Sequence, residues 1–229
     1  MRAAIVGLGV IGKVHAEVLA EQGIELAAVC DIDPAATEGR DCARYADFDE
    51  MLERERPDVV HICTPHWLHA DMIIKALERG VNVLEEKPLC IKEEDIARIL
   101  NAERTSDAVL GVCLQNRYNP STLLAREILA EKRVKYAFGS LLWHRDAAYY
   151  ASGDWRGKWA TEGGGVLINQ AIHTLDLLIL TCGDPRSVTA RTSSLALSDV
   201  IDVEDTVCAS FGGKVPFGLY ATNTAACDM

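Results

Sequence analysis

The sequence predicts an α/β protein in which a doubly wound parallel sheet is followed by an α+β domain with an open, mostly antiparallel sheet. In the first half, apolar strand-like runs alternate with amphipathic helical segments, as in parallel sheets covered by helices on both faces. In the second half, strand-like runs follow one another directly, which favours antiparallel pairing. The pattern changes near Asn116, so we predict domains of residues 1–117 and 118–229.

The elements of the first domain follow from hydrophobic periodicity and from their end signals. Gly23 and Gly80 each stand just past a helical segment, where glycine provides a left-handed C-terminal cap. The predicted strands cover residues 3–7, 24–30, 59–63, 81–84 and 109–114, and the predicted helices cover residues 12–22, 49–56, 69–79 and 92–104.

The second domain is predicted to begin with a helix over residues 121–131, because Pro120 suits a first helical turn. Residues 147–165 are rich in glycine, tryptophan and charge and are predicted to form a loop. The apolar residues that follow predict one long helix over 166–180, which ends near Gly183 and Pro185. The predicted strands cover residues 135–143, 188–197, 206–211 and 217–222.

The composition indicates a globular protein and disfavours several classes of partner. The chain has 229 residues, of which 49% are hydrophobic and 25% charged, as in globular proteins. A net charge of −11 disfavours nucleic acid and anionic membranes as partners. No apolar run reaches the roughly 20 residues that span a bilayer, and the chain opens directly on a strand pattern, so we expect a cytoplasmic protein. The eight cysteines lack C-x-x-C spacing and are expected to be free thiols.

A dinucleotide-binding motif, G-x-G-x-x-G, joins the first predicted strand to the first predicted helix. Gly7 permits a tight turn, Gly9 lets the backbone approach a pyrophosphate, and Gly12 lets helix and strand pack closely. The intervening Val10 and Ile11 belong to the same loop. Asp31 lies about 20 residues further on, where a carboxylate binds the adenosine ribose. Its charge would repel a 2′-phosphate, so we predict NAD as the cofactor in preference to NADP.

A second group of polar residues follows the later strands, at the edge where open α/β sheets bind ligands. Thr64 and Pro65 follow the third strand, and the Glu86–Pro88 segment follows the fourth, so Lys87 is expected near the nicotinamide. His66 and His69 have the spacing of metal ligands, but a third ligand is not evident nearby, and we predict no metal site. His69 is instead expected near the nicotinamide ribose or the substrate.

The third group is Asn169, His173 and Asp176, which would lie on one face of the predicted helix over 166–180. A polar stripe on an apolar helix is stable when it is hydrogen-bonded or faces a wet cleft. Two interpretations therefore remain open for His173: a residue of an active-site cleft, or a hydrogen-bonded histidine of the core.

Taken in order, these motifs resemble the glucose–fructose oxidoreductase, inositol dehydrogenase and rhizopine-catabolism (Gfo/Idh/MocA) family. The similarity covers nearly the whole chain. It includes the glycine motif continued to His15, Thr64-Pro65, Glu86-Lys87-Pro88, the run from Gln115 to Pro120, Trp155-Arg156-Gly157, and the run from Gly163 to Asp176.

The resemblance implies roles for individual residues. Lys87 would contact the substrate and the nicotinamide ribose, and His173 would exchange the proton. Glu86 and Asn116 would contribute to the cofactor site. Substrate contacts are expected from Lys87, Arg117, Trp155, Arg156, Asn169 and His173. Many members carry Asp at the position of Asn169, and an amide orients a hydroxyl but accepts no proton, which leaves Asp176 as a possible carboxylate partner of His173.

The resemblance also implies a NAD(P)-dependent dehydrogenase or reductase that acts on a secondary alcohol of a sugar, sugar derivative or cyclitol. Lys87 and His173, from different domains, are expected to meet in one cleft, with Asn169 as a third catalytic residue. The second sheet often mediates homo-oligomers in the family, and members usually continue with further strands, so this chain is expected to be short at its C-terminal end. Two alternatives stay open: NAD-dependent glycoside cleavage by oxidation and elimination, and a non-catalytic dinucleotide or sugar-binding regulator.

Overall fold

The computed structural model describes residues 1–228, which divide into two compact units. The first unit is Met1–Cys113 and the second begins at Leu114, a few residues before the predicted domain boundary. Each unit has its own sheet and its own core.

The first unit is a six-stranded sheet in the order β3-β2-β1-β4-β5-β6, with every neighbouring pair parallel. This is the doubly wound arrangement that the sequence predicts. Its strands are β1 (Arg2–Val6), β2 (Glu25–Cys30), β3 (Ala43–Tyr45), β4 (Val59–Ile62), β5 (Asn82–Glu85) and β6 (Leu110–Val112). Its helices are α1 (Val10–Glu21), α2 (Pro34–Thr37), α3 (Phe48–Glu55), the 3₁₀ turn η1 (His66–Leu68), α4 (His69–Glu78) and α5 (Glu93–Thr105).

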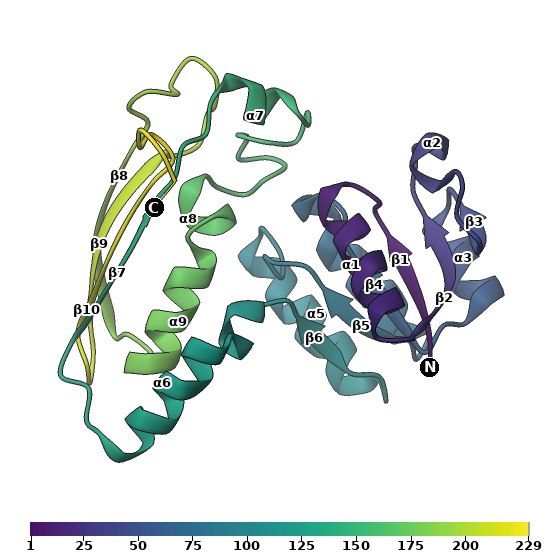
Figure 1. The fold of residues 1–229 in the computed structure, drawn as a ribbon, viewed down its shortest axis with the longest axis horizontal. Helices are drawn as coiled ribbons and strands as arrows, with labels where there is room; N and C mark the ends of the chain where they lie inside the picture. The colour runs from purple at the N-terminus through teal and green to yellow at the C-terminus, as the bar shows by residue number, and fades with distance from the viewer. Residues whose placement is uncertain (229) are drawn as a thin grey trace. The chain divides into compact units, whose positions relative to one another are not determined.

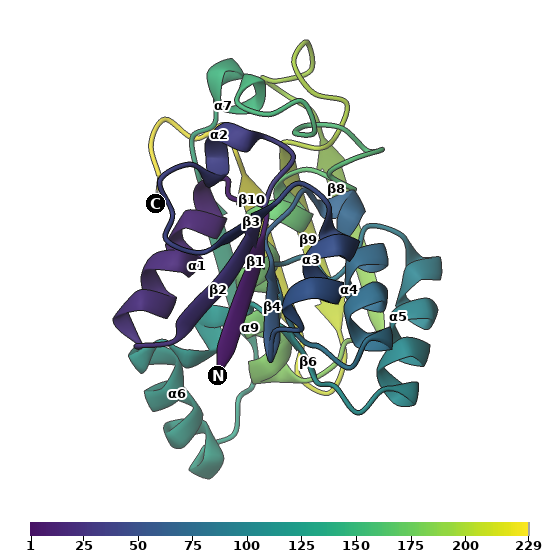
Figure 2. The ribbon, with the colours of Figure 1, turned by 90° about the vertical axis from the view of Figure 1, so that its right-hand side faces the viewer.

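Helices cover both faces of this sheet. Figure 2 shows α1 on one side and α3, α4 and α5 on the other. Alternate residues of β1 point to the two cores: Ile5 packs with Leu19 of α1, whereas Val6 packs with the cluster that contains Ile73 of α4. Both faces of this central strand are thus buried over residues 3–6, which explains the apolar sequence of that run.

Two short elements of this unit were not predicted from periodicity. The edge strand β3 has three residues and is only partly buried, so its sequence carries little hydrophobic signal. Helix α2 has four residues, and the Asp33 side chain accepts a hydrogen bond from the Ala35 N–H at its start. An Asp-Pro pair at the beginning of a helix is a recognisable capping signal.

The second unit holds a four-stranded mixed sheet in the order β7-β10-β9-β8. The β9 pairings are antiparallel, as predicted, whereas β7 and β10 pair in parallel. Its elements are η2 (Gln115–Tyr118), α6 (Pro120–Glu131), β7 (Ala137–Leu142), α7 (Ala147–Ala151), α8 (Val166–Asn169), α9 (Ile172–Cys182), β8 (Ser187–Ser193), β9 (Thr206–Gly212) and β10 (Phe217–Thr222).

Two predictions for this unit are wrong in detail. The segment 147–165 is not entirely a loop, because Asp146 accepts a hydrogen bond from the Tyr149 N–H and starts α7. The single helix predicted over 166–180 is two helices, α8 and α9, separated at residues 170–171. Long-range hydrogen bonds explain the break, since the Gln170 side chain bonds with Tyr149 and with Asn223.

Helix α9 packs on one face of this sheet, and the opposite face is not covered by a helix of the described chain (Figure 1). Gly139 of β7 permits the close packing, because a Cβ there would lie 2.7 Å from Cγ2 of Thr174. On the uncovered face Phe138 is 66% exposed and Tyr220 is 36% exposed. Among the described helices, none is both long and apolar enough to cross a membrane.

Candidate functional site

The glycine motif forms a tight turn between β1 and α1 that only glycine accommodates at two of its positions. Gly7 has a φ of +85°, and a Cβ there would lie 2.7 Å from the carbonyl carbon of Cys63. A Cβ on Gly12 would lie 1.9 Å from the Gly7 oxygen. These contacts bring the start of α1 against the carboxyl ends of β1 and β4, as dinucleotide-binding turns require.

Gly9 differs from the other two glycines, because a Cβ there would meet no atom within 4 Å. Gly9 is the N-cap residue of α1. The first turn of α1 has neither a side-chain cap nor an acidic residue. The neighbouring Val10 is 82% exposed and Ile11 38% exposed. A helix N-terminus with open space before it suits an anion, so the loop fits the pyrophosphate of a dinucleotide.

Asp31 follows β2 and braces the glycine turn. One carboxylate oxygen accepts a hydrogen bond from the Leu8 N–H at 2.6 Å, and the other accepts from the Asp33 N–H at 2.9 Å. Each oxygen can accept further hydrogen bonds, so ribose hydroxyls can be added to this arrangement.

The loops that carry Thr64 and Lys87 are joined by a buried pair, His69 and Glu85. Neither side chain has exposed surface, and His69 Nδ1 lies 2.8 Å from Glu85 Oε1. The ring nitrogens of His69 also lie 2.7 Å from the Pro88 oxygen and 2.8 Å from the Thr64 oxygen. His69 therefore lies beneath these loops and supports them. The predicted contact between His69 and the cofactor or substrate would require the loops to move.

The surroundings of this pair alter both pKa values. Burial alone would lower the pKa of His69, but the charge of Glu85 and the hydrogen-bonding acceptors raise it overall. Burial raises the pKa of Glu85 to about 7, against the opposing effect of the His69 charge. Folding therefore strengthens proton binding at both groups.

The Glu86 side chain makes its polar contacts with residues of the first unit. Its Oε1 lies 3.1 Å from His15 Nε2, and its Oε2 accepts a hydrogen bond from the Lys87 N–H at 3.2 Å. Burial would raise the pKa of Glu86, but His15 and Lys87 lower it overall. On its other side, His15 Nδ1 lies 2.9 Å from His61 Nδ1. Burial, followed by the charge of His15, lowers the pKa of His61 to about 4.

The remaining predicted residues near this edge have different degrees of exposure. Pro65, Thr64 and Lys87 are half-buried, and the Lys87–Pro88 peptide is cis. Asn116 lies in η2 of the second unit, where its side-chain oxygen accepts a hydrogen bond from Asn119 at 3.3 Å.

In the second unit, the break between α8 and α9 separates Asn169 from His173. Asn169 is the last residue of α8, and half-buried His173 lies in the first turn of α9, so the two do not share one continuous helix face as predicted. The Asn169 amide donates to the buried carboxylate of Glu162, which also accepts from the Gly157 N–H. The structure thus supplies a carboxylate beside Asn169 that sequence reasoning missed.

The glycine run before α8 is explained by a second buried carboxylate. Glu204 accepts hydrogen bonds from the Gly165 N–H at 2.9 Å and the Leu167 N–H at 3.1 Å. A Cβ on Gly165 would lie 1.8 Å from the backbone carbonyl oxygen of Glu204, so glycine is required there. Neither Glu162 nor Glu204 has a local sequence signal, because the fold brings their partners to them: backbone N–H groups for both, and also the Asn169 amide for Glu162.

Arg117 and Asp176 form a bidentate ion pair, with Nε–Oδ2 and Nη2–Oδ1 distances of 2.8 and 2.5 Å. Both oxygens of Asp176, considered from the sequence as a carboxylate partner of His173, thus accept from Arg117. The Arg117 side chain is 40% exposed, so a substrate contact from it stays a prediction.

Tyr149, Trp155 and Arg156, from the segment before α8, pack against one another. The Arg156 guanidinium lies 4.5 Å from the ring centre of Trp155 and 4.6 Å from that of Tyr149, and it donates a hydrogen bond to the Tyr149 hydroxyl at 2.8 Å. Stacking on two rings fixes the plane of this cation, while both Trp155 and Arg156 stay half-buried.

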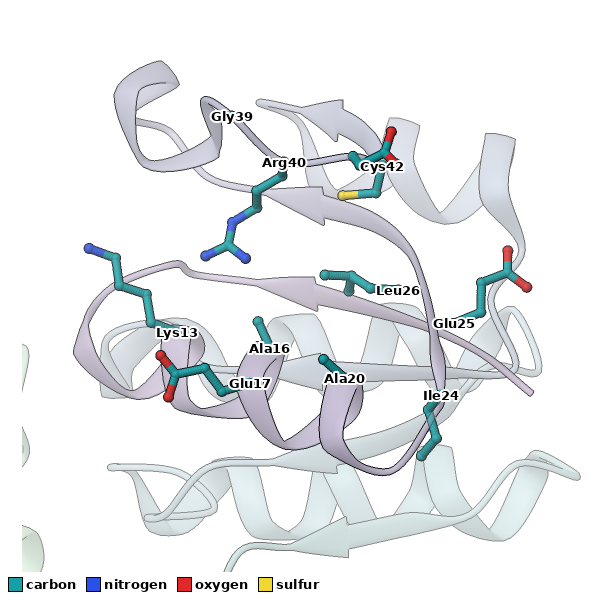
Figure 3. A pocket seen from close by; sticks show the side chains of 11 residues that line it. Lys13, Ala16, Glu17, Ala20, Ile24, Glu25, Leu26, Gly39, Arg40 and Cys42 are labelled. Atoms are coloured by element: carbon teal, nitrogen blue, oxygen red, sulfur yellow. The ribbon is translucent and has the colours of Figure 1, made fainter.

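A separate surface groove lies between α1, β2 and the segment after α2, and Figure 3 shows Lys13 and Arg40 extending over it. None of the predicted site residues lines this groove. Lys13 and Glu17 come from α1 and Arg40 comes from the opposite side of the groove (Figure 3), so the groove has mixed charge and we assign it no role.

Comparison with known proteins gives two family matches. A model described as oxidoreductase family, NAD-binding Rossmann fold, matches residues 1–114, and one described as GFO/IDH/MocA C-terminal domain matches residues 124–225. Among curated relatives, D-glucoside 3-dehydrogenase of Escherichia coli is 31% identical over 83% of this chain and 57% of its own length. Inositol 2-dehydrogenase of Rhizobium meliloti is 28% identical over 90% of this chain and 62% of its own length. The chain thus spans about three fifths of these relatives.

A similar solved structure is that of the WlbA dehydrogenase from Chromobacterium violaceum, in complex with NADH and UDP-GlcNAcA. It is 34% identical to this chain with a TM-score of 0.93, over 99% of this chain and 68% of that one.

We expect Gly12→Ala to destabilise the protein, because its methyl group would overlap the Gly7 carbonyl. The loss should be about 2 kcal/mol or more in urea unfolding. Gly9→Ala is the matched control: its Cβ enters open space, so stability should change by less than about 1 kcal/mol. Equal losses in the two variants would contradict the described packing.

The raised pKa of Glu85 predicts that its contribution to stability falls as the pH rises from about 4.5 through 7, and the raised pKa of His69 predicts a further fall above about pH 6.5. Glu85→Gln removes the carboxyl titration. The free energy of unfolding of the wild type should therefore fall relative to Glu85→Gln, by about 1–3 kcal/mol between about pH 5 and pH 8. Glu94→Gln, at an exposed position, serves as control. A difference in the free energy of unfolding between the wild type and Glu85→Gln that does not change with pH would contradict the role of the buried pair.

Proposed function

The chain belongs to the Gfo/Idh/MocA family of NAD-binding oxidoreductases, and we propose that it transfers a hydride between nicotinamide and a secondary alcohol of a sugar, sugar derivative or cyclitol. The relatives that it matches are longer, so the activity and the substrate of the complete protein are part of this proposal.

The observation that carries the proposal is the glycine turn. Gly9 faces open space at an uncapped helix N-terminus, and Asp31 stands beside it with acceptor capacity for a ribose. This donor and acceptor set matches a dinucleotide with a free 2′-hydroxyl. The same turn also anchors α1, whose His15 contacts Glu86 next to Lys87.

Bound NAD would supply the hydride acceptor for oxidation of the alcohol. His173 would accept the hydroxyl proton at an imidazole nitrogen, since histidine is well suited to proton exchange near neutral pH. Lys87 would donate a hydrogen bond from Nζ to the same oxygen as negative charge develops on it.

Asn169 would orient a neighbouring substrate hydroxyl. Its contact with the buried Glu162 fixes the side chain, and a fixed amide orients a ligand at a smaller entropic cost than a mobile one. Trp155 and Arg156 would contact the sugar ring or an acidic group on it. Support comes from the stacked, half-buried arrangement of Arg156 and from the UDP-GlcNAcA bound by the WlbA structure.

We also propose a cytoplasmic, homo-oligomeric protein that associates through the uncovered face of its second sheet. The exposed Phe138 and Tyr220 on that face support the assembly, because apolar groups on an uncovered sheet face are typical of interaction surfaces. Arg117 and Asn116 remain proposed ligand contacts.

The proposal is tested by adding NAD and a panel of sugars, sugar acids, sugar nucleotides and cyclitols and by following the absorbance of the reduced cofactor. On a substrate that turns over, Lys87→Met should lower kcat/KM by about 10²–10³-fold and His173→Asn by about 10²–10⁴-fold. Lys92→Met in the first unit and His144→Asn in the second are matched controls outside the proposed site.

The outcomes separate the alternatives. Release of a sugar from glycosides without net reduced cofactor would favour oxidation and elimination, and calorimetric NAD binding without turnover on any substrate would favour a regulator. Near wild-type kcat/KM in Lys87→Met would contradict the role given to this lysine.

A further inference from the structure

Four side chains capable of metal coordination or its support gather in the first unit. His15 lies in α1 and His61 in β4, while Glu86 follows β5 and Cys113 follows β6. Strands β4, β5 and β6 are neighbours in the parallel sheet, so Glu86 and Cys113 lie at one edge and α1 brings His15 to them. The ligand atoms of His15, Glu86 and Cys113 all lie within 4.8 Å of one another.

This cluster is sheltered from solvent. The side chains of His15 and Glu86 are 11% and 10% exposed, and Cys113 is half-buried. His15 Nε2 lies 3.1 Å from Glu86 Oε1, and the Cys113 sulfur lies within 4.8 Å of the ligand atoms of both residues. The three donors therefore converge within a small, largely enclosed volume.

His61 completes the arrangement behind His15. The 2.9 Å contact between their Nδ1 atoms requires one of the two rings to carry the proton. When His15 donates from Nδ1, its Nε2 lone pair points toward Glu86 and Cys113. Histidines that bind metals almost always donate their other ring N–H to a neighbouring acceptor, which fixes the ring orientation.

The donor types specify the class of ion. One imidazole nitrogen, one carboxylate oxygen and one thiolate sulfur suit Zn²⁺, whereas Mg²⁺ and Ca²⁺ prefer oxygen ligands throughout. Tetrahedral zinc places its ligand atoms about 3.3–3.8 Å apart, and small side-chain rotations can bring three donors that lie within 4.8 Å of one another to that spacing.

We propose that His15, Glu86 and Cys113 form a binding site for a borderline divalent cation such as Zn²⁺, with His61 orienting His15. The site departs from the sequence-based expectation of no metal, which considered only His66 and His69. Three protein ligands leave a fourth position for water or another ligand.

The test titrates CoCl₂ into the full chain with its exposed thiols removed by Cys208→Ser and Cys227→Ser. Tetrahedral Co²⁺ reports its geometry by visible absorption and reports a thiolate ligand by a near-ultraviolet charge-transfer band. We expect one Co²⁺ per chain, displaced by ZnCl₂. Cys113→Ser should abolish the charge-transfer band, and the half-buried Cys90→Ser should retain it.

His15→Gln and Glu86→Gln should each weaken Co²⁺ binding at least about tenfold, and His61→Phe by about 10–100-fold. Circular dichroism checks that each variant folds, and the two cysteine variants decide the case if a histidine variant does not fold. Absence of Co²⁺ binding, a charge-transfer band that persists in Cys113→Ser, or equal loss of the band in Cys90→Ser would overturn the proposal.

Discussion

The contact between the glycine turn and the end of β4 is the constraint on which the candidate site of the first unit depends. Gly7 lies against the backbone of Cys63, and Gly12 lies against Gly7, so α1 begins directly at the carboxyl edge of the sheet. This packing gives Gly9 its open surroundings. It also sets the direction of α1, whose His15 reaches Glu86 beside Lys87. The close packing of Gly7 and Gly12 thereby positions both the glycine turn and the loop that carries Lys87.

Buried carboxylates hold the loops around this framework. Glu85 pairs with His69 beneath the loop that carries Lys87, and Glu204 accepts hydrogen bonds from backbone N–H groups at the start of α8. Asp205 has no exposed surface and accepts hydrogen bonds from three successive backbone N–H groups, those of Leu195, Ala196 and Leu197. Burial of a charge is costly unless hydrogen bonds offset it, so each carboxylate holds its loop in one conformation. Rigid loops suit a site that must orient a ligand.

The first unit was largely predictable from the sequence because its signals are local. The glycine turn, the apolar strands and the glycine caps depend on neighbours within one helical turn or one strand. The parallel sheet with helices on both faces and the family are therefore confirmed. The strand β3 was not predicted because it has only three residues, none of them buried, and so carries no hydrophobic period.

The second unit was less predictable because distant contacts decide its details. Residues 166–180 are apolar enough for one helix, but Gln170 bonds to Tyr149 and Asn223, far away in sequence, and the helix breaks there. Asn169 and Glu162 meet through the same fold-dependent packing. For α7 the signal was local, since Asp146 is a recognisable capping residue.

The most direct test of the account is calorimetry of NAD and NADP binding to the wild type, to Asp31→Asn and to a matched Asp33→Asn control. The account predicts that the wild type binds NAD at least about tenfold more tightly than NADP, a difference of about 1.4 kcal/mol. The preference should shrink in Asp31→Asn, where the repulsion of a 2′-phosphate is lost, and stay unchanged in Asp33→Asn. Equal affinity of the wild type for both cofactors, or a preference that survives in Asp31→Asn, would contradict it.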